Sequence, residues 1–70
     1  MIRDAELSEM TVAGLTRLSD RLEGALRGHT VHQLNHEGRN AVLAGPDLTT
    51  MRLAHDLNRV IWAIIERGDA

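Results

Sequence analysis

The sequence predicts an all-α fold, an antiparallel helical hairpin that assembles as a homo-oligomer. Phe and Tyr are absent and there is one Trp, so the core must consist of Leu, Ile, Val, Ala and Met, which suit helix packing. Two long segments repeat apolar residues at the helical period. The 70 residues contain no cysteine, so a single domain over residues 1–70 has no disulfide. Its stability must come from very good helix packing, oligomerisation or a histidine-bound metal, and burial between subunits is the simplest of these.

The first helix is expected over about residues 8–37, after a short lead at residues 1–7. Either Ser8 or Thr11 can act as its N-cap. Gly28 either ends this helix or lies inside it, because apolar residues continue beyond it. One side of the helix collects the apolar residues Leu7, Leu15, Leu18, Leu22, Ala25 and Leu26.

The connection between the helices is expected at residues 38–47. Gly38 breaks the pattern, and Gly45 with Pro46 gives the strongest turn signal in the chain. The apolar residues 41–44 between them form either a turn or a short third helix. The chain therefore reverses its direction here, which produces the hairpin.

The second helix is expected over about residues 48–67, with Asp47, Thr49 or Thr50 as its cap. Seven apolar residues fall within an arc of about 140°, namely Leu53, Ala54, Leu57, Val60, Ile61, Ile64 and Ile65. Met51 and Trp62 lie just outside this arc and form a second apolar side. One partner helix cannot cover both sides, so we expect an oligomer interface at Met51, Leu57, Ile61, Trp62 and Ile65.

Charge and hydropathy exclude several classes of protein. The net charge of −2 is spread along the chain without a basic stripe, so nucleic acid is not an expected partner. The longest apolar run, Val60–Ile65, is far shorter than the roughly 20 residues that cross a bilayer, and the N-terminus lacks an apolar signal segment. These features predict a protein of the cytoplasm that does not enter the membrane.

Catalytic motifs are absent from the sequence. There is no cysteine nucleophile, no Gly-x-Ser-x-Gly elbow and no phosphate loop with its lysine, so neither an enzyme nor a cofactor is expected. His29, His32 and His36 share one side of the first helix if it continues through Gly28. They either bind a metal or line an oligomer seam or the wet edge of the hairpin, and the second interpretation is favoured because the zinc-protease pattern is incomplete.

Ligand-binding candidates gather on the second helix. The backbone N–H groups beside Thr49 and Thr50 could hold a phosphate, although a simple cap and a solvated arginine explain the same residues. Trp62 with Arg52 or Arg59 from a neighbouring subunit could stack a nucleobase, although packing is the more common role of such a residue. The candidate set is Thr49, Thr50, Arg52, His55, Arg59 and Trp62.

A helix-turn-helix is a further alternative. Ala41, Gly45, Met51 and Ala54 have its spacing, with the second helix as recognition helix. Pro46 fits that motif poorly, and the isoleucines of the second helix are typical of a core.

Two short stretches carry a family resemblance. They are residues 6–9, Glu-Leu-Ser-Glu, and residues 56–64, where Asp-Leu-Asn is followed by Ile-Trp-Ala-Ile. The second is similar to the Asp-Leu-Gln and apolar-Met-Ala-Leu run of small phage helical-hairpin sponges that counter CBASS and Thoeris immunity. The resemblance implies a homo-oligomer of hairpins whose pockets, between subunits, bind a cyclic nucleotide signal without cleaving it. A phage-encoded chain would act in the host cytoplasm.

These observations order the functions that we expect. The first is a non-enzymatic anti-defence protein that sequesters a small signalling ligand of cyclic-nucleotide type. The second is a protein-interaction module, an adaptor or inhibitor, that grips a host protein with its Met51/Trp62 face. The third is a small DNA-binding regulator.

Overall fold

The computed structural model describes residues 2–68, which form four helices and no strand. The predicted all-α class is therefore confirmed. The helices are α1 (Asp4–Glu9), α2 (Val12–Glu37), α3 (Arg39–Ala44) and α4 (Leu48–Gly68). No helix in this part of the chain has the length and hydropathy that a membrane crossing requires.

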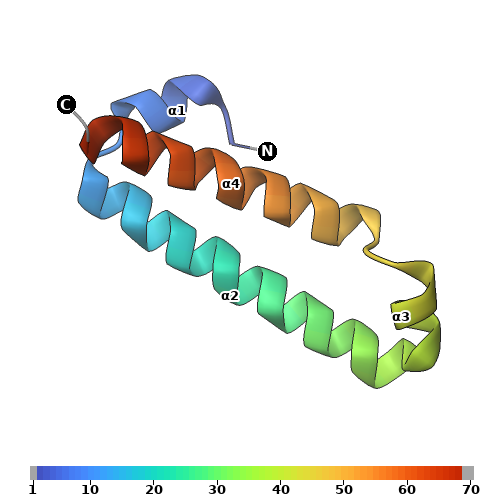
Figure 1. Cartoon of the computed structure of the whole chain (residues 1–70). Helices are drawn as coiled ribbons and strands as arrows, with labels where there is room; N and C mark the ends of the chain where they lie inside the picture. Colours follow the sequence, from blue (N-terminus) through green and yellow to red (C-terminus); the bar gives the residue numbers. More distant parts are fainter. Residues whose placement is uncertain (1, 69–70) are drawn as a thin grey trace.

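The two long helices dominate the molecule. α2 and α4 lie side by side and run in opposite directions (Figure 1). α1 lies beside the C-terminal end of α4, and α3 fills the connection at the opposite end of the molecule. The result is an elongated shape with principal extents of 45 × 19 × 16 Å.

The N-terminal region differs from the prediction, which placed residues 1–7 in a lead and began the first helix at residue 8. Helix α1 already starts at Asp4, where two acidic residues in the first turn complement the helix dipole. The chain is extended at Met10 and Thr11, and the Thr11 hydroxyl accepts from the Gly14 N–H at 3.1 Å to cap α2. Burial of Leu7 against the core secures this separate short helix.

Two glycines decide where the helices end in the connection. Helix α2 passes through Gly28 without a break and ends at Gly38, whose φ of 57° is open to glycine. Gly45, with φ 78°, ends α3 in the same way. Residues 41–44 lie in α3, so the short third helix is the alternative that the structure adopts.

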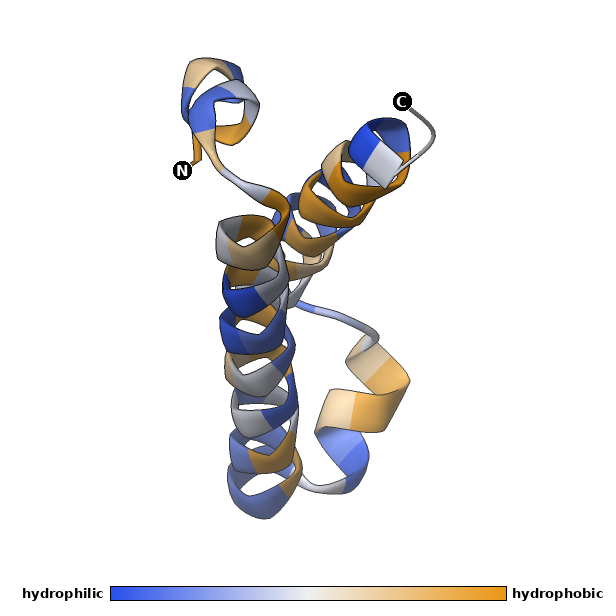
Figure 2. Cartoon of the chain, turned by 90° about the vertical axis from the view of Figure 1, so that its left-hand side faces the viewer, coloured by the Kyte–Doolittle hydropathy of each residue, from blue (hydrophilic) through white to orange (hydrophobic). Residues whose placement is uncertain are grey.

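The core is small and lies near one end of the molecule. Three side chains are buried among the described residues, Leu7 from α1, Leu15 from α2 and Val60 from α4. Partly buried apolar residues pack around them, including Leu18, Leu22 and Ile64. In Figure 2 the apolar colouring extends over α4 and α3, well beyond this core. Much apolar surface therefore faces outward.

Candidate functional site

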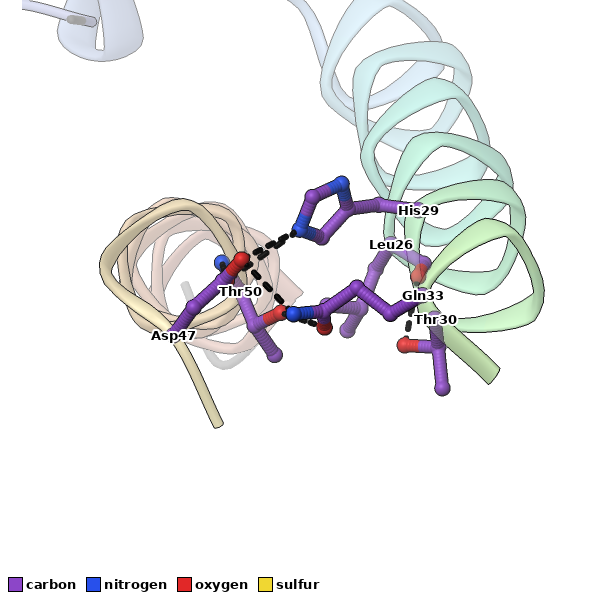
Figure 3. A network of polar contacts seen from close by, with 6 residues as sticks. All are labelled: Leu26, His29, Thr30, Gln33, Asp47 and Thr50. Carbon is purple, nitrogen blue, oxygen red and sulfur yellow. Dashed lines mark hydrogen bonds and ion pairs between the residues drawn. The ribbon is translucent and has the colours of Figure 1, made fainter. Parts of the chain in front are cut away.

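A polar network joins α2 to the first turn of α4 (Figure 3). The Asp47 carboxylate accepts from the Thr50 backbone N–H at 2.8 Å and from the Gln33 amide at 2.8 Å. His29 Nε2 lies 3.0 Å from the same carboxylate. The Thr50 N–H and the His29 ring lower the pKa of Asp47 from 3.8 to about 2. Asp47 is thus both the N-cap of α4 and the link between the long helices.

This network occupies the predicted phosphate position at the start of α4. The Thr50 N–H already donates to Asp47, and the Thr50 hydroxyl donates to Gln33 Oε1 at 3.4 Å. Thr49 is exposed on the same turn. A bound phosphate would have to displace the Asp47 carboxylate from the Thr50 N–H.

Arg59, another predicted ligand residue, is engaged inside the chain. Its guanidinium donates to the Ile2 carbonyl at 2.7 Å, pairs with Asp4 and lies 3.3 Å from Asp56 Oδ1. The hydrogen bond to Asp4 raises the pKa of Arg59. Arg59 therefore binds the N-terminal segment, at Ile2 and Asp4, to α4.

Three other predicted ligand residues are exposed on α4. Arg52 and His55 line a shallow hollow together with Met51 and Asp56. Trp62 lies two turns beyond His55, on the same side of the helix, and 57% of it is exposed. This group combines a cation, an imidazole and an indole on a surface open to solvent.

The predicted oligomer interface is mostly exposed as well. Met51, Ile61 and Ile65 are 55%, 41% and 45% exposed. Leu57 is partly buried, since it lies one turn from the buried Val60. The predicted interface does not include Asn58, and the predicted arc places Ala54 with the inner apolar residues. Both residues are exposed, on the same side of α4 as Ile61 and Ile65. Their spacing of three and four residues was the signal that could have revealed them.

The three histidines of α2 do not converge. His29 faces Asp47, whereas His32 and His36 are exposed with ring centroids 4.2 Å apart. Among residues 2–68 no group of three or more His, Cys, Asp or Glu side chains is arranged to hold a metal.

The helix-turn-helix alternative has little support in the arrangement of α3 and α4. Arg59 and Arg67 of α4 bind carbonyl and carboxylate groups near the N-terminus of the chain. Over Leu48–Gly68, the outward side of α4 exposes Met51, Ile61, Trp62 and Ile65 beside the single cation Arg52, whereas a recognition helix offers mainly polar and cationic groups to DNA.

Comparisons with protein-family models, with curated proteins and with solved structures find no match to this chain.

Proposed function

We propose that the chain is a non-enzymatic protein-interaction module, a helical hairpin that works as a homo-oligomer assembled through the outward side of α4. The observation that carries this proposal is the exposure of Met51, Ile61, Trp62 and Ile65 along one side of a single helix. Large apolar side chains exposed along one side of a helix are typical of a binding surface.

The accessible surface supports the same proposal. The chain exposes 5305 Å², whereas a folded monomer of 7.8 kDa exposes about 4,400 Å². The excess of about 900 Å² is close to the roughly 800 Å² that each partner buries in an ordinary protein interface. The elongated shape and the apolar side chains exposed on α2, α3 and α4 both contribute to this excess, so one contact of ordinary size would bring the exposed surface of each chain near that of a compact monomer.

The binding partner is an amphipathic helix. An exposed apolar stripe on a helix recognises another helix through side chains spaced three and four residues apart. A second copy of α4 satisfies this requirement and is always present at the concentration of the chain itself. A host or partner helix of the same pattern would compete for the same surface.

Charge reversal of the apolar side tests the proposal. Ile61→Glu should convert the oligomer into a monomer, measured by light scattering, because the charge would be buried on assembly. Val31→Glu, at an exposed apolar position of α2, is the matched control and should leave the mass unchanged. A mass that responds equally to both substitutions, or to neither, contradicts the assignment of the surface to α4.

Sequestration of a small anionic ligand of cyclic-nucleotide type is the second candidate function. It is favoured by the exposure of Arg52, His55 and Trp62 on one helix, since an arginine and an indole can bind a phosphate and a base. Titration of the Trp62 fluorescence with cyclic di- and trinucleotides tests it. A saturable change with intact nucleotide recovered supports sequestration, whereas a flat response leaves the interaction module.

A further inference from the structure

The outward side of α4 contains a heptad repeat. Exposed residues recur at alternating intervals of three and four, at Met51, Ala54, Asn58, Ile61 and Ile65. These are the a and d positions of a coiled coil, with Met51, Asn58 and Ile65 at a. We call these five residues the heptad seam. It lies on the side of α4 away from Val60, which packs on the core.

The polar residue of the heptad seam indicates which helix packs on it. Asn58 is the one polar side chain among the five, and it lies at the central a position. An asparagine amide has both a donor and an acceptor, so it is complementary to a second copy of itself. A buried Asn at one a position fixes the register of a coiled coil and favours two strands.

We propose that the heptad seam pairs in parallel with the seam of a second copy, so that the two Asn58 amides hydrogen-bond across a two-fold axis. This inference rests on the proposed function, because it specifies the geometry of the self-association. Pairing would remove the exposed side chains of Met51, Ile61 and Ile65 from water.

The hydrogen bonding of Asn58 favours a parallel over an antiparallel orientation of the two helices. In a parallel pair, identical positions meet layer by layer, so each Asn58 finds the other. In an antiparallel pair, a positions face d positions, and Asn58 would face Ala54 or Ile61, which offer no side-chain partner. A buried amide without a hydrogen-bond partner destabilises the pair in each chain. In the parallel arrangement both Asn58 amides have a partner, so neither chain is destabilised in this way.

The pairing also covers the exposed tryptophan. Trp62 and His55 occupy the e positions beside the seam, and Leu57 occupies a g position. In a parallel pair the e residue of one helix packs on the g residue of the other, so the indole lies against Leu57 of the second copy. The exposed apolar area of Trp62 is thereby buried in the dimer.

Single cysteines test the arrangement, because the chain contains no cysteine of its own. Asn58→Cys, Met51→Cys and Ile65→Cys are each oxidised alone, and Asp20→Cys on the exposed side of α2 is the control. A disulfide spans only about 4.4–6.8 Å between Cα atoms, so a crosslink reports that the two positions meet. The parallel pair predicts a crosslinked dimer as the main product of each seam variant and little from the control.

Other outcomes overturn the inference in distinguishable ways. A crosslink that forms only when an a-position and a d-position variant are mixed, either Met51→Cys with Ile61→Cys or Ala54→Cys with Ile65→Cys, shows an antiparallel pair, and it leaves the homo-oligomer intact. A monomeric mass at all concentrations overturns the inference together with the proposed function. The role of Asn58 has its own test, since Asn58→Leu should give assemblies of more than two chains by light scattering. Asn35→Leu, at an exposed position of α2, should not, and an unchanged two-chain mass for Asn58→Leu overturns this role.

Discussion

His29 Nε2 lies 3.0 Å from Oδ2 of Asp47, and this contact ties the second half of α2 to the start of α4. The small apolar core involves Leu7, Leu15 and Val60, toward the other end of the molecule. The two long helices are therefore joined by apolar packing at one end and by a polar network at the other. The polar network and the apolar core can therefore be tested by separate substitutions.

Stability in acid should depend on Asp47. Its pKa is lowered in the folded chain to about 2 from an ordinary value of 3.8. A carboxylate with a lowered pKa stabilises the fold above pH 3.8, and this contribution disappears as the pH falls toward 2. Thermal unfolding of the parent and of Asp47→Asn should therefore differ most above pH 4 and converge near pH 2. A constant difference over this range would contradict the assignment.

Loss of the cap should also be visible at neutral pH. Asp47→Ala removes the acceptor of the Thr50 N–H and the partner of His29, so the midpoint of thermal unfolding should fall. Asp20→Ala, an exposed carboxylate on α2, is the matched control and should have little effect. Equal effects of the two substitutions would show that the network does not stabilise the junction.

The core should be sensitive at Leu15, which is fully buried. Leu15→Ala leaves a cavity and should reduce the free energy of unfolding by about 2–5 kcal/mol in denaturant titrations. Val42→Ala on α3 is the control, because 69% of Val42 is exposed and its truncation leaves no cavity. A small loss at Leu15 would mean that α1, α2 and α4 do not meet as described.

Much of the fold follows from the sequence, and the exceptions have physical causes. The periodicity of Leu15, Leu18 and Leu22 predicts the inner side of α2 because burial selects apolar residues there. Helix α1 was not predicted, because a six-residue helix has little intrinsic stability and depends on the distant partners of Leu7. Position on a helical wheel also places Arg59 on the wet side, whereas its pairing with Asp4 joins residues 55 apart in the chain.

Part of the candidate site could be predicted, and the missed part again depends on contacts between residues far apart in the chain. The sequence shows that Arg52, His55 and Trp62 lie on α4, and the structure leaves all three exposed. The sequence does not show that the Asp47 carboxylate already occupies the start of α4. The contacts of Asp47 with His29 and Gln33 depend on the packing of the two helices. Long-range polar contacts of this kind leave no periodic signal.

Two glycines should respond in opposite directions to alanine. At Gly28 a Cβ meets nothing within 4 Å inside a continuous helix, so Gly28→Ala should stabilise the chain by about 0.5–1 kcal/mol. At Gly38 the φ of 57° is paired with a ψ of −126°, which suits glycine alone, so Gly38→Ala should destabilise it. Denaturant titration measures both, and the same sign for both would contradict the helix boundaries.

Arg67 should hold α1 in place. Its guanidinium donates to the carbonyls of Leu7, Ser8 and Met10 at the end of α1. Arg67→Gln should therefore speed hydrogen exchange of the α1 amides, whereas Arg52→Gln, at an exposed position, should not. Unchanged exchange in α1 after loss of Arg67 would assign its attachment to Leu7 and Arg59.

Sedimentation equilibrium of the unmodified chain over a wide range of concentration measures its self-association without any substitution. A reversible species of twice the chain mass of 7.8 kDa is expected if a second copy covers the exposed side of α4, as proposed. A mass of 7.8 kDa at every concentration would contradict it, since the apolar side of α4 would then remain in water.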